Sequence, residues 1–345
     1  MNVDYIVVGC GLAGIHFCEQ LKVHQKSFVV FDNLSQQSSV VAGGLYNPVV
    51  LKRFTSVWNS AEQLALALPV YKTLENNLNV KLDYKIAILR RFTSIEEQNN
   101  WFSASDKPEL AQFLSTDIIK NSNTSIDALF GFGKVLQTGR IDTKLLISEY
   151  KNQLRETNRI IEGTFEYNAL NYEKELSYKD ISAKHIVFAE GFGLKKNPFF
   201  SDLPMQEVKG ELLTIYAPNL KIDYVLKSSV FIIPLGDDLY RIGATYDWKD
   251  KTNMITAKAK EVLLNKLKTF VKCDFDVVSQ VAGIRPTVID RRPLVGMHEL
   301  HKNMYVLNGL GTRGVMIGPY IARELFNFIE HDIVLDNTID INRFK

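Results

Sequence analysis

The chain has 345 residues, of which 46% are hydrophobic and 23% charged, and its formal net charge is +2. This length exceeds one typical domain, so two domains are expected, and the apolar content excludes a disordered or collagen-like chain. The 41 Lys and Arg residues nearly balance the 39 Asp and Glu residues. The balance gives no global attraction to nucleic acid or to an anionic membrane, although it leaves room for a local basic patch.

Several features favour a cytoplasmic protein with no metal site. The three cysteines are too few for a disulfide framework, and none has the spacing of a zinc ligand. An apolar run begins at Tyr5 without a signal-peptide pattern before it. The uncharged stretch 5–18 is too short to cross a bilayer, and its glycines suit a turn. We therefore expect no membrane span.

The first 32 residues predict a strand–helix–strand unit. Residues 5–8 and 27–31 are continuous apolar runs, typical of strands buried on both faces of a parallel sheet. Between them, residues 15–22 place apolar side chains at helical spacing. A loop rich in Gln, Ser and Gly follows over 36–48.

The rest of the chain predicts further helices and strands. Helical spacing predicts helices over 60–77, 142–155 with Asp142 as N-cap, 256–270, and 317–329 with Pro319 near the first turn. The polar stretch 93–127 leans towards helix. Apolar runs predict strands within 81–92, 159–167, 184–189, 209–216, 230–234, 239–244 and 304–308. Gly236-Asp237-Asp238 is a hairpin turn signal between two of these strands.

The order of these elements predicts two interleaved domains in an α/β fold. Segments with α/β pattern lie at the start, in the middle and at the end, and β-rich segments lie between them. We assign residues 1–80, 135–205 and 280–345 to a Rossmann-like nucleotide-binding domain. Residues 81–134 and 206–279 are assigned to an antiparallel-sheet α+β substrate domain.

A dinucleotide-binding signature opens the chain. Gly9, Gly11 and Gly14 form GxGxxG between the first strand and the first helix, and Asp32 ends the second strand. The glycines permit a tight turn and close approach of the backbone to a diphosphate, while the helix N-terminus attracts its charge. Asp32 is expected to accept hydrogen bonds from a ribose. The pattern does not separate NAD from FAD, and a glycine turn without ligand is the alternative.

Two more glycine-rich signatures follow. Ala42–Pro48 contains two adjacent glycines, which suit close approach to a flat group or, alternatively, a plain loop. Gly283-Ile284-Arg285-Pro286 begins a C-terminal set that continues through Asp290, Arg292-Pro293, Gly296 and 309–314. With this set, the sequence resembles the D-amino-acid oxidase/glycine oxidase family of flavoproteins along nearly the whole chain. Some motifs look most like the FAD oxidase half of a bifunctional enzyme that modifies the wobble uridine of tRNA.

The resemblance implies FAD as cofactor, in a domain of the glutathione-reductase type. It also implies the residues that bind this cofactor: Gly9, Gly11, Leu12, Ala13, Gly14, Phe31, Asp32, Asn33, Ala42, Gly43, Gly44, Leu45, Phe165, Ala189, Glu190, Gly191, Gly309, Leu310, Gly311, Thr312, Arg313, Gly314 and Val315. Glu190 departs from the threonine that is usual in the family, and no physical reason for it is visible in the sequence.

The resemblance further implies a catalytic set of Arg285, Arg313 and Tyr46. Arg285 matches the family arginine that holds a substrate carboxylate in a two-point fork, and an interdomain salt bridge is the alternative. Arg313, with the helix dipole behind it, would stabilise negative charge on the reduced flavin, unless it is a surface arginine.

Three further residues are candidates for substrate binding, namely Arg53, Arg241 and Tyr246. The alternative for Arg53 is an exposed charged side chain, and the alternative for Tyr246 is a ring that packs in the core or on the sheet surface. Arg241 stands where the sarcosine-oxidase branch carries a lysine that assists oxygen reduction, and Thr245 stands where that branch has histidine. These departures argue against fast use of oxygen.

The function expected from these residues is FAD-dependent oxidation of the C–N bond of an amino acid or N-substituted glycine by hydride transfer. None of the six histidines falls inside a motif, which is consistent with catalysis by positioning. One alternative is oxidation of a carboxymethylaminomethyl group on tRNA, which the near-neutral charge disfavours. The other is a non-catalytic dinucleotide-binding protein. No oligomeric state is predicted.

Overall fold

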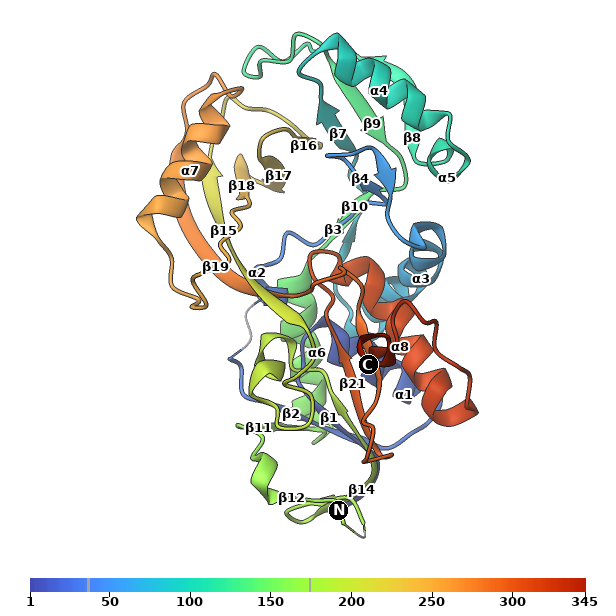
Figure 1. Cartoon of the computed structure of the whole chain (residues 1–345). Helices are drawn as coiled ribbons and strands as arrows, with labels where there is room; N and C mark the ends of the chain where they lie inside the picture. The colour runs from blue at the N-terminus through green and yellow to red at the C-terminus, as the bar shows by residue number, and fades with distance from the viewer. Residues whose placement is uncertain (36–37, 174) are drawn as a thin grey trace.

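A mainly parallel sheet forms the lower part of the molecule in Figure 1, in a computed structural model that describes residues 1–35, 38–173 and 175–345. The parallel strands follow the order β11-β2-β1-β14-β21, with antiparallel additions at β13, β12 and β20. Residues 36 and 37 of the predicted loop lie outside the described residues. The strands are β1 (Asn2–Val8), β2 (Phe28–Asp32), β11 (Ile160–Glu162), β12 (Leu170–Asn171), β13 (Ser177–Tyr178), β14 (Ile181–Phe188), β20 (Leu294–Met297) and β21 (Met304–Asn308).

Both faces of this sheet are buried, which explains the continuous apolar runs in its strands. In β1, Tyr5 and Val7 pack into the core with the helices, whereas Ile6 and Val8 pack into a second core on the other face. Helices α1 and α3 both pack on α8. The helices are α1 (Leu12–Val23), α3 (Ser60–Leu78), α6 (Thr143–Glu156) and α8 (Gly314–His331).

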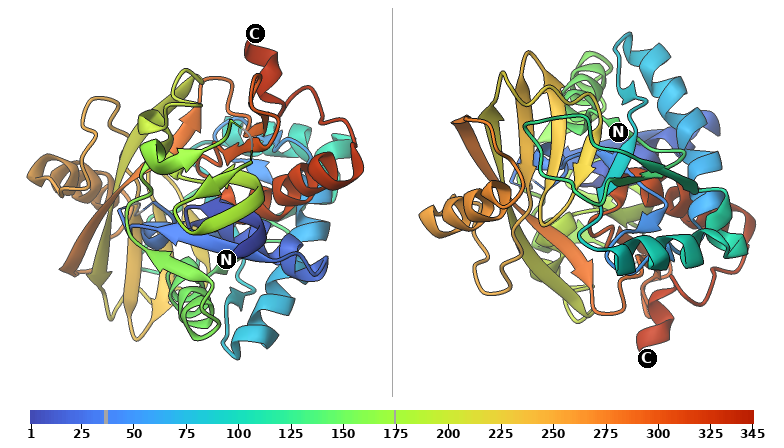
Figure 2. Two further views of the ribbon diagram at one scale, coloured as in Figure 1. Left: turned by 90° about the horizontal axis from the view of Figure 1, so that it is seen from below. Right: turned by 90° about the horizontal axis from the view of Figure 1, so that it is seen from above.

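A second, largely antiparallel sheet forms the upper part. Its strand order is β19-β15-β18-β17-β16-β7-β9-β8, and α7 packs on β15 (Figure 1). Seen from below and above, α7 lies on one flank of the molecule, with α3 and α8 on the opposite flank (Figure 2). The elements are β7 (Ile88–Arg91), β8 (Leu114–Ile119), β9 (Phe132–Val135), β15 (Met205–Tyr216), β16 (Val225–Lys227), β17 (Phe231–Gly236), β18 (Leu239–Gly243), β19 (Asp276–Val288), α4 (Ile95–Ser105), α5 (Pro108–Ala111) and α7 (Ala257–Lys268).

Short elements fill the space between the sheets. Strands β3 (Leu45–Tyr46), β10 (Gly139–Ile141) and β6 (Asp83–Tyr84) form a small sheet. The other short elements are β4 (Val49–Val50), β5 (Thr55–Ser56), α2 (Ser38–Val41), η1 (Tyr167–Ala169), η2 (Gly191–Lys196) and η3 (Ile341–Phe344). Among the described residues, no helix is both long and apolar enough to cross a bilayer.

The long strands β15 and β19 connect the two sheets. They pair from Met205 opposite Val288 to Tyr216 opposite Asp276. Met205 and Val288 pack in the core beneath the parallel sheet, while Leu213 packs in the core of the upper sheet. The proposed boundary between residues 279 and 280 lies inside β19, so a single pair of strands takes part in both proposed domains.

The predicted α/β class is confirmed, as are several local predictions. Asp142 caps α6, since its Oδ1 accepts a hydrogen bond from the amide of Leu145 at 3.1 Å. Strands β17 and β18 form the predicted hairpin, and Asp237 and Asp238 both adopt positive φ in its turn. Short polar residues tolerate this conformation better than most others.

Three local predictions were wrong. The stretch 93–127 contains two helices but also strand β8, an edge strand that pairs with the next strand, β9. The strand expected over 159–167 ends at Glu162, where β2 also ends. Helix α8 begins at Gly314, so Pro319 lies inside the helix instead of in its first turn.

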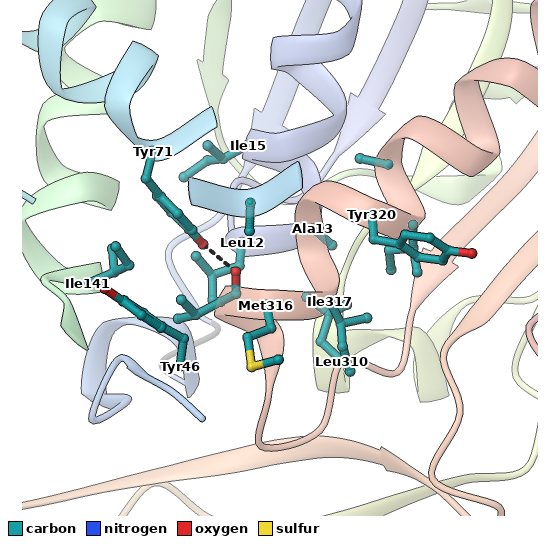
Figure 3. Close-up of a cluster of buried hydrophobic side chains, with 14 of the residues drawn as sticks. Leu12, Ala13, Ile15, Tyr46, Tyr71, Ile141, Leu310, Met316, Ile317 and Tyr320 are labelled. Atoms are coloured by element: carbon teal, nitrogen blue, oxygen red, sulfur yellow. Dashed lines mark hydrogen bonds between the residues drawn. The ribbon is translucent and has the colours of Figure 1, made fainter. Parts of the chain in front are cut away.

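The interior proline of α8 is compensated by a tyrosine from another helix. Pro319 has no amide hydrogen, so it cannot donate to the carbonyl of Val315 one turn earlier. Instead, the hydroxyl of Tyr71 on α3 donates to that carbonyl at 2.9 Å, and it also lies 3.0 Å from Nε2 of His16 on α1. Tyr71 therefore links three helices through one buried hydroxyl (Figure 3).

We expect Tyr71→Phe to lower the free energy of unfolding by about 1–3 kcal/mol, because it leaves the Val315 carbonyl buried without a donor. Pro319→Ala restores an amide that can supply this bond. Tyr71→Phe should therefore lower the free energy of unfolding less in the Pro319→Ala background than in the parent chain, as measured by urea unfolding. Equal losses in the two backgrounds would show that the carbonyl is not the group that matters.

Candidate active site

A cavity of about 1260 Å³ lies between the parallel sheet and the antiparallel sheet. The loop after β1 and residues of strands β16 and β19 all line it. Such a volume accommodates a dinucleotide together with a small second molecule. The wall brings together segments that are far apart in sequence, from Val8 to Val315.

The end of the cavity nearest β1 is suited to a diphosphate. Gly11 is the N-cap of α1 and provides no side chain for the amides of the first turn. A β-carbon on Gly14 would lie 1.9 Å from the carbonyl oxygen of Gly9, so only glycine lets the helix pack this closely. Gly11, Leu12 and Ala13 line the cavity, and the helix N-terminus adds positive potential there.

Asp32 lies beside this helix end and is paired with a lysine. Its carboxylate forms an ion pair with Lys151 of α6 and accepts a hydrogen bond from the amide of Leu34 at 3.1 Å. Both Asp32 and Lys151 line the cavity. An ionised carboxylate can accept hydrogen bonds from two neighbouring hydroxyls, as a ribose would require.

Glu190 forms a local network on the same wall. Its two carboxylate oxygens accept hydrogen bonds from the hydroxyl of Tyr167 and from the amide nitrogen of Asn197, the latter at 2.7 Å. Burial raises the pKa of Glu190, and the two hydrogen bonds oppose this rise. The structure thus gives Glu190 a physical role in joining η1 to η2, which the sequence did not reveal.

The middle of the cavity is framed by loop 42–45 and by the N-terminus of α8. Arg313 is the N-cap of α8, and residues 310–315 line the wall. Figure 3 shows Leu310 and Ile317 packed beside Leu12 and Ala13, so the N-terminal ends of α1 and α8 lie close together. Two helix N-termini therefore add positive potential to one cavity.

Arg285 lies on β19, where the carbonyl of the next residue, Pro286, accepts a hydrogen bond from the amide of Gly311 at 3.0 Å. Its guanidinium lies 4.7 Å from the centre of the Tyr246 ring, and Nη1 donates to the carbonyl of Thr245 at 3.3 Å. A β-carbon on Gly210 of β15 would lie 1.9 Å from Nη2, so the guanidinium rests on the strand where a side chain is missing. Burial lowers the pKa of Arg285, but a guanidinium stays charged at neutral pH.

Most residues expected from the sequence line this one cavity, including Phe31, Asn33, Phe165, Ala189, Gly191, Gly311, Thr312 and Tyr246. Gly14 and Gly309 shape the backbone without lining the wall. A β-carbon on Gly309, at positive φ, would lie 2.6 Å from Val288. Among the described residues no carboxylate lies within 4.0 Å of Arg285. Within the described residues, Arg285 therefore does not form the interdomain salt bridge that was the alternative to carboxylate binding.

Three residues expected to be catalytic or to bind substrate lie off the cavity wall. Tyr46 is buried, and its hydroxyl donates to Asp83 at 2.8 Å, so we drop it from the catalytic set. Arg53 is exposed, and the adjacent Lys52 lines the cavity instead. Arg241 does not line the cavity, and burial, together with the charge of Arg140, lowers its pKa. Side-chain direction in these short strands depends on pairing partners that sequence spacing does not specify.

The sequence also missed basic residues on the wall, notably Lys151, Lys227 and Arg90. None belongs to a recognisable motif. Lys227 and Arg90 come together only because β16 pairs in parallel with β7, which places these two residues opposite each other. A helical position facing the end of β2 was the one signal available for Lys151.

A model of the FAD dependent oxidoreductase family matches residues 4–327 of the chain. The tRNA 5-methylaminomethyl-2-thiouridine biosynthesis bifunctional protein MnmC of Campylobacter jejuni subsp. doylei is 25% identical over 155 residues, or 42% of this chain and 25% of that protein. Glycine oxidase of Bacillus subtilis is 25% identical over 150 residues, or 41% of this chain and 39% of that enzyme. The matched stretches thus span well under half of each relative.

The fold is shared with solved structures over almost the whole chain. Glycine oxidase from Geobacillus kaustophilus superimposes with a TM-score of 0.81 and covers 97% of each chain at 17% identity. The chain therefore shares its fold, including the arrangement of the two sheets, with that glycine oxidase.

Replacement of Lys151 tests the cavity as a dinucleotide site. We expect Lys151→Met to weaken FAD binding by about ten-fold or more, because the buried Asp32 carboxylate loses its ion-pair partner beside the ribose site. The measurement is a titration of apoprotein with FAD, followed by quenching of flavin fluorescence. Lys144→Met is the matched control, since Lys144 is an exposed lysine on the same helix. Equal affinities in both variants would contradict the assignment.

Proposed function

The chain is a member of the FAD-dependent oxidoreductase family, and we propose that it oxidises the C–N bond of an amine that carries a carboxylate. The substrate would be an amino acid or an N-substituted glycine. The observation that carries this proposal is the Arg285 guanidinium, which lies flat on Gly210 in the cavity wall and has no carboxylate within 4.0 Å among the described residues. A guanidinium without a protein carboxylate is suited to one supplied by a substrate.

The residues of the cavity fit FAD. The uncapped N-terminus of α1 and the close contact at Gly14 suit the diphosphate, and Asp32 suits the ribose. When bound, FAD supplies an acceptor for the hydride that leaves the α-carbon of the amine. We assign the ring end of the cofactor to loop 42–45 and to residues 310–315, where Arg313 and the α8 N-terminus favour negative charge.

Two residues of the cavity position the substrate for this reaction. Arg285 fixes the carboxylate by two parallel hydrogen bonds, and Tyr246 covers the same guanidinium, so the α-carbon is held in one orientation. Removal of a hydride leaves an imine, which water hydrolyses to an amine and a carbonyl compound. Among the described residues no histidine lines the cavity, so catalysis rests on position and charge.

A second candidate is oxidation of a carboxymethylaminomethyl group on tRNA. The loop after β18 favours it, because Tyr246, Trp248 and Met254 are exposed there with Lys249 close by in sequence. Exposed aromatic rings beside lysines suit unstacked bases of an RNA loop. The net charge of +2 argues against an extended RNA surface but not against a local one.

Anaerobic mixing with small amines separates these readings. We expect the yellow holoenzyme to lose its visible flavin absorbance on addition of glycine, sarcosine, proline or a D-amino acid. Reduction by none of them, together with tight binding of tRNA, would favour the second candidate. A purified chain that takes up no FAD would contradict both.

Two variants test the position of the substrate carboxylate. We expect Arg285→Met to lower kcat/KM by about 100-fold or more, because the charge that orients the substrate is lost. Gly210→Ala should raise KM strongly, since its β-carbon forces the guanidinium away from the strand. FAD content and the flavin spectrum should stay close to those of the parent chain in both variants. Unchanged kinetics in either variant would rule out this position for the carboxylate.

A further inference from the structure

Three partly buried cations on the cavity wall have no protein counter-ion among the described residues. Among the described residues, no carboxylate lies within 4.0 Å of the charged groups of Arg285, Arg313 or Lys227. All three are partly buried, so water screens their charges only in part. Partly buried cations without a partner are costly, which indicates anionic groups that arrive with ligands.

The acids of the same wall are already satisfied. Asp32 pairs with Lys151, and Glu207 pairs with Lys251 at 3.3 Å. Glu190 accepts hydrogen bonds from Tyr167 and Asn197. The surplus of positive charge at the substrate end is therefore not cancelled by any acid that lines the described part of the wall.

Lys227 has surroundings that leave its charge available. Its Nζ lies 4.7 Å from the centre of the Phe231 ring on the neighbouring strand, and its parallel partner in the sheet is Arg90. Arg90 is neutralised by Glu97, whose Oε1 accepts from Nε at 2.8 Å. Burial, together with the charges of Arg90 and Arg313, lowers the pKa of Lys227 to about 8, so the ammonium still predominates at neutral pH.

The order of the strands separates Lys227 from the proposed carboxylate site. Arg285 lies on β19 and Lys227 on β16, and β15, β18 and β17 lie between these two strands in the sheet. Both side chains nevertheless line the same cavity, together with Arg313. In the proposed function, a substrate carboxylate neutralises the charge of Arg285, and negative charge on the reduced cofactor neutralises that of Arg313. The third cation has no partner in a substrate with one carboxylate.

We propose that Lys227 binds a second acidic group of the substrate. The preferred substrates are then amines with two anionic groups, such as N-substituted glycines whose substituent ends in a carboxylate or a phosphonate. This inference rests on the proposed function and narrows its substrate class. Arg285 would hold the glycine carboxylate, and Lys227 would hold the acid at the other end of the molecule.

The test compares matched pairs of N-substituted glycines that differ in one charge. The acids are N-(carboxymethyl)-, N-(2-carboxyethyl)- and N-(3-carboxypropyl)glycine, and each is paired with its uncharged terminal amide. N-(phosphonomethyl)glycine distinguishes phosphonate from carboxylate. We expect at least one acid to exceed its amide by about ten-fold or more in kcat/KM for anaerobic flavin reduction.

Variants of Lys227 assign that preference to one side chain. Lys227→Met should reduce the acid-to-amide ratio to within about two-fold of unity, and Lys227→Arg should keep most of it. Lys134→Met is the matched control, because Lys134 is an exposed lysine of the same sheet that does not line the cavity. It should retain the full ratio. FAD content, read from the flavin spectrum, excludes loss of folding in each variant.

The outcomes separate this inference from the proposed function. If sarcosine reduces the flavin but no acid exceeds its amide, the proposed function stands and the second acidic group is refuted. If no amine reduces the flavin, the proposed function itself fails. A fall in kcat for sarcosine with a shifted pH profile in Lys227→Met would instead make Lys227 a proton acceptor, which also overturns the inference.

Discussion

The pairing of β15 with β19 is the constraint on which the cavity depends. One end of this strand pair lies in the core under the parallel sheet, and the other belongs to the upper sheet. Gly210 and Arg285 sit on these two strands, in the stretch between the ends. The proposed carboxylate site thus lies on the strand pair that joins the two sheets, and backbone hydrogen bonds set its position.

The electrostatic potential in the cavity depends on where charged groups lie along its wall, not on the net charge of the chain. A chain with a net charge of +2 directs two helix N-termini and several unpaired cations to one wall. The acids of that wall are bound to protein partners, so they cancel little of the potential at the substrate end. Low polarity around the cations strengthens their attraction for an incoming anion. Net charge alone therefore says little about which ligands such a cavity takes.

The sequence predicted what depends on local pattern. The GxGxxG loop, the N-cap Asp142 and the hairpin at Asp237 each need only neighbouring residues, and the structure has the expected local conformation at each. The family resemblance added Arg285, which lines the cavity. Strand β8 was missed because it is an edge strand whose sequence, LSTDII, has polar residues in its middle. Tyr46 was placed in the site for another reason: it pairs with Gly139 of β10, which is distant in sequence, and its hydroxyl donates to Asp83.

The contrast between Arg90 and Lys227 shows how a local capping motif shapes a distant site. Ser94 caps α4 by accepting from the amide of Glu97, and Glu97 in turn accepts from the amide of Thr93. This reciprocal arrangement fixes the carboxylate at the helix start, where it binds Arg90. Lys227, directly opposite Arg90 in the sheet, gains no such partner. Of these two adjacent cations, Arg90 is therefore neutralised within the protein, whereas the charge of Lys227 is available to a ligand under the proposal above.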